Sequence, residues 1–93
     1  MSQKRLIGCP LEWFAWALSL TKSKEQFALA LYLYRRACVV RSATVTVPSR
    51  ELTELGFGRK AKYHLLLSLE DVGIVRVEQR NGRATRVTLS RWP

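Results

Sequence analysis

The chain has 93 residues, of which 47% are hydrophobic, and its 16 Lys and Arg against 7 Asp and Glu give a formal net charge of +9. This length fits one domain, and the hydrophobic share excludes a disordered polycation. The positive charge favours a polyanionic partner, with nucleic acid ahead of an anionic membrane.

The first half of the chain predicts two helices. The first is Leu11–Leu20, because Pro10 before it suits a helix start. This segment is apolar almost all the way round, so we expect it to be buried on several sides or shared with another subunit. Ser23 and Gln26 form a capping-box pattern, which predicts a second helix over Lys24–Val39. We expect that helix to be the central one of the core.

The second half predicts a short strand, two helices around a glycine turn, and a β-hairpin. Alternating apolar and polar residues indicate the strands, and Pro48 and the glycines mark where elements end. Both glycines of the turn are free to adopt positive φ, and Gly73 suits the position after a helix end. Leu52 and Leu55 are expected to face inward. The elements are a strand at Ala43–Val47, helices at Ser49–Leu55 and Arg59–Val72, the turn Gly56–Gly58 between them, and a hairpin at Ile74–Leu89.

The register of the hairpin follows from its side chains. A two-residue Asn81-Gly82 turn would pair Val77 with Arg86 and mix unlike residues on one face. A loop centred on Gly82 instead pairs Val77 with Val87, which makes one face apolar and the other charged. We therefore predict the second register, with a tip of three or five residues.

The two cysteines and the apolar stretches bear on the compartment. Cys9 and Cys38 are too few for a disulfide framework and lack metal-ligand spacing, so we expect buried thiols in a reducing cytoplasm, with one bridge between them left open. Trp13–Leu20 and Phe27–Tyr34 are shorter than the roughly 20 residues of a bilayer span. The chain is thus expected to be cytoplasmic.

The order of elements resembles that of the winged helix-turn-helix family. The resemblance is carried by the stretch SRELTELGFGRKAKYHLLLSLEDVGIVRVEQRNGRATRVTL, residues 49–89. It is similar to the C-terminal part of many small bacterial, archaeal and phage regulators. It implies an α+β, mainly α fold, with an extra N-terminal helix in residues 1–22, a winged helix-turn-helix core in residues 23–93, and a C-terminal hairpin wing.

The resemblance also implies the DNA-facing residues. In that family the second helix of the motif lies in the major groove, and here that helix is Arg59–Val72. Basic side chains at its start suit guanine O6 and N7 or phosphates. Guanidinium groups on a hairpin suit phosphate or a narrow minor groove. The expected DNA-binding residues are Arg59, Lys60, Lys62, Tyr63 and His64 on the helix and Arg80, Arg83 and Arg86 on the hairpin, and Leu67 also faces outward.

Two positions depart from the family pattern. Lys62 stands where a β-branched core residue is common. Either its stem packs while its ammonium reaches outward, or the helix is rotated so that Ala61 and Leu65 carry the core. The capping position is Gly58, which offers no side-chain cap.

Nothing in the sequence indicates a cofactor or a metal. His64 is the single histidine and has no Cys, Asp or Glu at ligand spacing, so we expect a surface or partly packed residue. The stretch Gly56–Ala61 matches a dinucleotide fingerprint formally, but it follows a helix and has no βαβ unit around it. We therefore expect neither a nucleotide cofactor nor a metal site.

Trp13, Phe14 and Trp16 are three large rings close together. One buried face would not hold them all, so we expect part of this surface to be the interface of a homodimer. A symmetric dimer would also place two reading helices about 34 Å apart on one face of DNA.

These observations favour a non-enzymatic protein that binds double-stranded DNA sequence-specifically. Such a protein would be a transcription regulator or a control protein of a plasmid or phage. The first alternative is a protein-interaction module on the same scaffold, since fold alone does not fix function. Binding of structured RNA is a third hypothesis. An enzyme is the weakest one, because no nucleophile and base are paired in the sequence.

Overall fold

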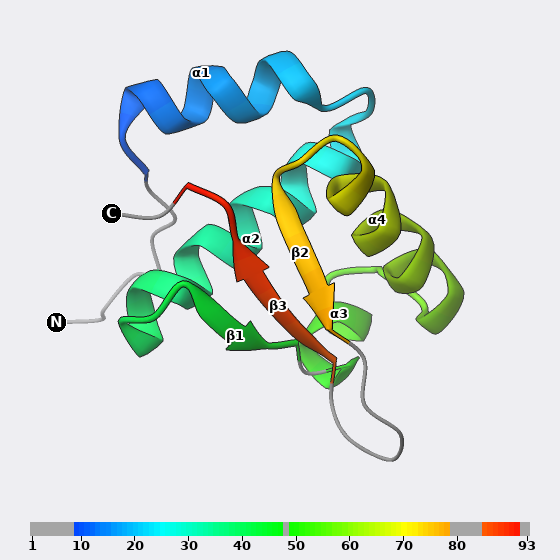
Figure 1. Cartoon of the computed structure of the whole chain (residues 1–93). Helices are drawn as coiled ribbons and strands as arrows, with labels where there is room; N and C mark the ends of the chain where they lie inside the picture. Colours follow the sequence, from blue (N-terminus) through cyan, green and yellow to red (C-terminus); the bar gives the residue numbers. More distant parts are fainter. Residues whose placement is uncertain (1–8, 48, 79–84, 92–93) are drawn as a thin grey trace, which may run out of the picture.

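The computed structural model describes residues 9–47, 49–78 and 85–91, which form a mainly helical α+β arrangement with an antiparallel sheet (Figure 1). Each predicted helix and strand is present, with ends that differ by one residue or none, and both strands of the predicted hairpin are found. In chain order they are α1 (Leu11–Leu20), α2 (Lys24–Val40), β1 (Thr44–Thr46), α3 (Ser49–Glu54), α4 (Arg59–Asp71), β2 (Val75–Glu78) and β3 (Arg86–Leu89).

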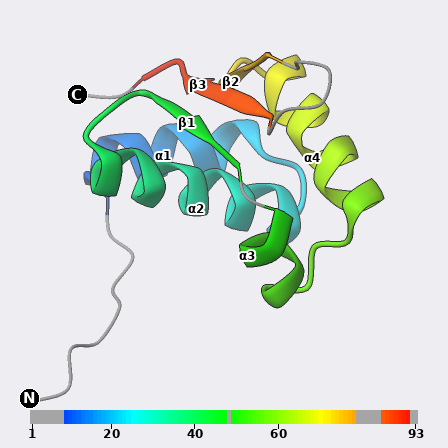
Figure 2. The same ribbon diagram turned by 90° about the horizontal axis from the view of Figure 1, so that it is seen from below.

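Helix α2 is the central element, as predicted. It contacts α1, α4 and the strands β1 and β3. The sheet, in the order β1-β3-β2, lies along one side of α2, while α3 and the start of α4 lie at the far end of the molecule from α1 (Figures 1 and 2). The start of α2 is capped as expected: the Ser23 hydroxyl accepts a hydrogen bond from the Gln26 N–H at 3.1 Å. The Gln26 side chain accepts from the N–H of Lys22 at 2.6 Å rather than from that of Ser23.

Positive φ occurs where the chain must leave a helix. Gly56 has φ +96°, and the Phe57 N–H donates to the Leu52 carbonyl at 2.8 Å, which closes α3 with a Schellman motif. Gly73, at φ +88°, ends α4 in the same way, as predicted. Gly58 differs from the prediction: its φ is −68°, an extended conformation that any residue can adopt. Arg41, which ends α2, has φ +56° without being a glycine.

The hairpin has the predicted register. Val77 pairs with Val87, and the neighbouring pairs are Val75 with Leu89 and Glu78 with Arg86. Val75, Val87 and Leu89 are buried, so the apolar face covers the core. The predicted tip falls outside the described residues.

Strand β1 is an edge strand whose outer backbone groups meet side chains. The Leu89 N–H of β3 donates to the Ala43 carbonyl. Backbone groups of successive residues in an antiparallel strand point to opposite sides, so those of Thr44 and Thr46 point away from β3. The Thr44 N–H donates to the Ser42 hydroxyl at 3.1 Å. The Arg36 side chain donates to the Thr46 carbonyl at 2.8 Å.

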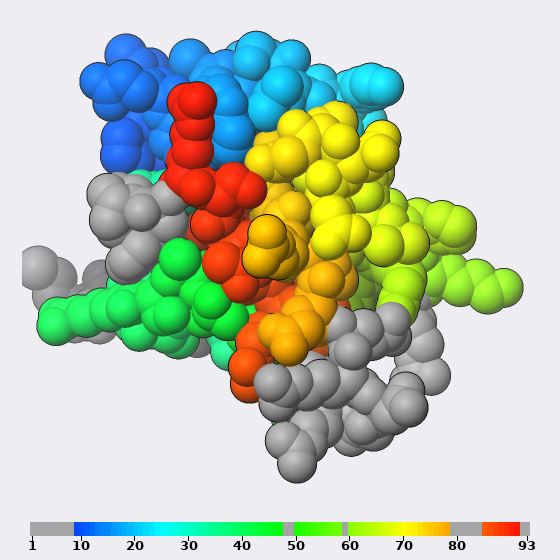
Figure 3. All heavy atoms as spheres, in the orientation of Figure 1, coloured from blue at the N-terminus to red at the C-terminus, as the bar shows by residue number. Residues whose placement is uncertain are grey.

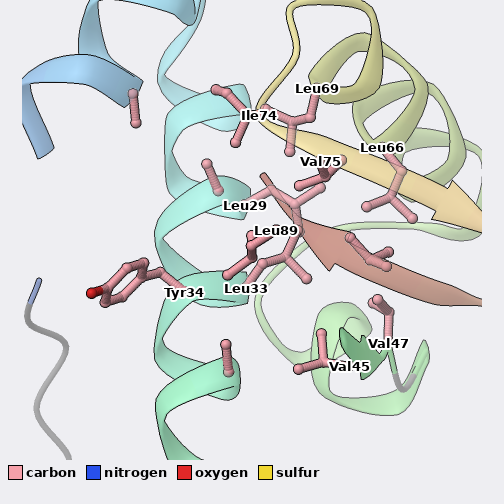
Figure 4. Packing of buried hydrophobic residues seen from close by; sticks show 14 of the residues in the cluster. Leu29, Leu33, Tyr34, Val45, Val47, Leu66, Leu69, Ile74, Val75 and Leu89 are labelled. Carbon is pink, nitrogen blue, oxygen red and sulfur yellow. The ribbon is translucent and has the colours of Figure 1, made fainter. Parts of the chain in front are cut away.

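Leucines of α2 and α4 and the inner residues of the sheet form the core (Figure 4). Leu29 and Leu33 point from α2 toward the sheet, where they are fully buried. Leu52 is also fully buried, as predicted, whereas Leu55 is 58% exposed, because it lies just beyond the end of α3. The prediction that Cys38 is buried was wrong: it follows the buried Ala37 and so turns about 100° away from the core face.

Trp13 is a core residue, which corrects its assignment to a subunit interface. It is 6% exposed, and its ring centroid lies 4.5 Å from that of Tyr34, which points from α2 away from the sheet (Figure 4). Trp16 is half-buried beneath the guanidinium of Arg91, 4.6 Å from the ring centroid. Phe14 is 37% exposed and packs edge to face on Phe27. One side of α1 is therefore anchored, because α2 provides a second aromatic surface for it.

Candidate nucleic-acid interface

The connection from α3 to α4 positions the start of α4 at the surface. Helix α3 is held to α2, because the Tyr32 hydroxyl donates to the Glu51 carboxylate, and Arg36 lies 3.7 Å from the same group. Burial first, and then Glu51, raise the pKa of Tyr32 to about 12. The Gly56 turn then directs the chain into α4, whose first intrahelical bond runs from the Lys62 N–H to Gly58. The N–H groups of the preceding residues have no acceptor within the helix.

The outward face of α4 carries three of the side chains that were predicted to face outward. Lys60, His64 and Leu67 are exposed and follow one another at helical spacing, so they share a face. Tyr63 is half-buried beside them. Atoms from the first half of α4 (yellow-green) project from the right-hand edge of the molecule (Figure 3). Arg59 begins the helix, but its side chain lies outside the described part of the structure.

Lys62 does not belong to this face, which corrects its predicted role in DNA binding. It is 8% exposed, and its ammonium donates to the Val47 carbonyl at 3.3 Å. It stands four and seven residues before the buried Leu66 and Leu69, so helical spacing places it on the core side. The rotated alternative is also wrong, because Ala61 is exposed. The spacing from the two leucines was the signal in the sequence.

The charges of α4 are placed against its dipole. Its first turn has Arg59 and Lys60 and no acidic residue, while Glu70 and Asp71 stand at its end. Each such placement is unfavourable by about 0.3–1 kcal/mol at an exposed site. Glu70 has a structural role, since its carboxylate accepts the Val77 N–H of the sheet edge at 2.8 Å. The exposed Lys60 has a position that folding does not favour, and together with the free N–H groups it makes this end of α4 attractive to an anion.

The hairpin adds arginines on the outer face of the sheet. Arg86 is half-buried and stands opposite Glu78, and both lie on the polar side of the strands. Arg80 and Arg83 fall outside the described residues. The sequence interpretation missed Arg76, which is exposed on the same face; the alternation along β2 was the signal. It also missed Arg50 of α3, whose side chain is 92% exposed and lies 3.9 Å from Glu54.

Within residues 9–47, 49–78 and 85–91, no three His, Cys, Asp or Glu side chains gather in a way that could hold a metal ion, and His64 stands exposed on α4. In the same part of the chain no helix has the length and apolar character needed to cross a bilayer. Burial raises the pKa of the Cys9 thiol, and the nearby Cys38 adds to the effect.

No protein-family model, curated protein or solved structure matches the chain.

Proposed function

We propose that the chain is a winged-helix protein that binds double-stranded DNA sequence-specifically, as a transcription regulator does, with α4 in the major groove and the β2–β3 hairpin as the wing. The order of the helices and the strand order β1-β3-β2 are compatible with such a fold. The single observation that carries the proposal is the start of α4, where an exposed lysine and unpaired N–H groups lie on the surface of a chain with net charge +9.

Each group on this face has a chemical counterpart on duplex DNA. The Lys60 ammonium can donate to guanine O6 and N7, and the apolar Leu67 can contact a thymine methyl group. The N–H groups at the start of α4 suit a phosphate. Arg76 and Arg86 on the outer face of the sheet can meet the phosphate backbone. Lys60 is therefore expected to specify sequence, whereas the arginines of the sheet are expected to fix position.

The first test separates base reading from general charge. A duplex is selected from a random pool, and salt titrations are run on it and on a scrambled duplex. Lys60→Ala is expected to cost about 1–3 kcal/mol on the selected duplex and little on the scrambled one. Arg41→Ala is the matched control, because it removes one exposed cation at the far end of α2. It is expected to change both affinities slightly and equally. If Lys60→Ala weakens both duplexes equally, Lys60 anchors a phosphate and does not specify sequence.

The second test uses the empty capping position. A Cβ at Gly58 would meet no atom within 4 Å, so Asn and Asp both fit there. Both are better caps than glycine by a few tenths of a kcal/mol, so both variants should unfold at slightly higher urea. Either cap occupies an N–H group that would otherwise meet the phosphate. Only Gly58→Asp also adds a negative charge there, so the Asp variant should bind DNA about tenfold more weakly than the Asn variant. Equal affinity of the Asp and Asn variants, together with an inert Lys60→Ala, would refute DNA binding through α4 and favour the protein-interaction alternative.

A further inference from the structure

The outer face of α1 is apolar and exposed although the helix is already anchored on its other side. Leu11 is 77% exposed, Leu18 is 53% exposed and Phe14 is 37% exposed. Trp13 and Ala17 face the core instead, so the outer residues cannot reach it without α1 detaching. Ala15, which is exposed between Leu11 and Leu18, leaves the middle of this outer face flat. Figure 3 shows α1 along the upper edge of the molecule.

Charge singles out this helix as a place where two copies can meet. The chain carries a net charge of +9, so most approaches of one copy to another are repulsive. Helix α1 contains one charged residue, Glu12, and that residue is exposed at its start. The exposed Lys22 and Lys24 follow just after its end. An antiparallel arrangement of two α1 helices brings Glu12 of each copy toward the lysines of the other.

The shape of the surface supports the same arrangement. A largely apolar hollow of about 350 Å³ lies at the end of α1, where Leu18 and Phe27 line it together with Lys22 and Lys24. Leu11, the most exposed large apolar side chain on α1, stands at the other end of the helix. When two α1 helices cross antiparallel at Ala15, the start of each helix faces the hollow of the other. A two-fold symmetric contact uses the same patch on both copies. This patch can pair with itself because Leu11 lies at one end of α1 and the hollow at the other.

We propose that a second copy of this chain docks on the outer face of α1, with the two α1 helices antiparallel and crossing at Ala15. A helix of ten residues is about 15 Å long, so the contact is smaller than a standard interface. The dimer is therefore weak and depends on concentration. The face lies at the opposite end of the molecule from the start of α4 (Figure 1), so this proposal is independent of the proposed DNA binding.

Sedimentation equilibrium without nucleic acid tests the proposal. The average mass of the full chain is expected to rise with concentration from that of one chain toward twice that mass. Leu18→Glu and Leu11→Glu should each hold it at the single-chain mass, and both residues are exposed enough for the variants to fold. Val39→Glu is the matched control, because Val39 is 63% exposed on α2 and is expected to leave the association unchanged.

Charge reversal tests the antiparallel direction. Glu12→Lys should weaken the dimer, and adding Lys22→Glu and Lys24→Glu should restore it. Circular dichroism and urea unfolding of each variant show whether it is folded. A single-chain mass of the unmodified protein up to about 1 mM would overturn the proposal, since that excludes even a weak complex. Equal loss of association in Val39→Glu and Leu18→Glu would overturn it as well, because the effect would then follow from added charge alone.

Discussion

Replacing Trp13 tests whether the aromatic side of α1 belongs to the core. A tryptophan buries about 150–250 Å² of surface, which corresponds to about 4–6 kcal/mol at about 25 cal/mol per Å². Only 6% of the Trp13 surface is exposed, so nearly all of this area is buried in the folded protein. The area estimate is an upper bound, because the unfolded chain already buries part of that surface. Trp-to-Ala substitutions in cores cost about 3–5 kcal/mol, and we expect Trp13→Ala to fall in this range.

The indole N–H of Trp13 lowers the cost expected for Trp13→Phe. Among the described residues, the Trp13 indole N–H is buried without a hydrogen-bond partner. Such a group costs about 1–3 kcal/mol, and Trp13→Phe removes it while keeping a ring against Tyr34. The lost contact area and the recovered cost should nearly cancel, so Trp13→Phe should change the free energy of unfolding by less than about 1 kcal/mol.

Urea unfolding followed by circular dichroism measures the series, with Leu11→Ala as a control on the same helix. Leu11 is 77% exposed, so its removal should stay within about 0.5 kcal/mol. At about 4–8 °C per kcal/mol for a domain of this size, Trp13→Ala should also lower Tm by more than 10 °C. If Trp13→Ala costs less than about 1 kcal/mol while the protein stays folded, the burial argument is wrong.

Three further predictions concern the backbone and pH. Gly73→Ala should destabilise the protein by about 1–2 kcal/mol in urea unfolding, because φ is +88° there. An added Cβ would meet no atom within 4 Å, so the cost comes from the backbone conformation alone. An unchanged free energy of unfolding would contradict this prediction. Arg41→Gly should stabilise by about 0.5–1 kcal/mol in the same assay, since Arg41 has φ +56°, and a loss would show that its side chain matters more than its backbone. Because the pKa of Tyr32 is raised from 10.0 to about 12, its contribution to stability is complete below pH 10 and is lost as the pH rises toward 12. The unfolding free energy should therefore fall more steeply from pH 10 to 12 than in Tyr32→Phe, and parallel curves would refute the shift.

Local rules predicted the elements of this chain well, because each signal acts within a few residues. The alternation of the hairpin determined the pairing of Val77 with Val87, and a glycine ended α4 at Gly73. The errors at Lys62 and Trp13 came from contacts between elements distant in sequence. The Lys62 ammonium reaches the carbonyl of Val47, the residue after β1, and Trp13 is buried because Tyr34 lies across from it on α2. Helical spacing from Leu66 and Leu69 indicated the core side for Lys62. A sequence pattern contains neither the Val47 carbonyl nor Tyr34, however, so it does not show what holds these two side chains in the core.

The two edges of the small sheet carry a consequence for how the protein behaves at high concentration. An open strand edge is a template on which other chains add strands, and this is how edge-to-edge aggregates and fibrils grow. Here Arg36 of α2 bonds the outer carbonyl of β1, and Glu70 of α4 bonds an outer N–H of β2. Each flanking helix thus supplies a charged side chain that occupies a backbone group a foreign strand would need. An incoming strand would have to displace an ionised partner at either edge, so the fold resists templated growth even where the chains are crowded.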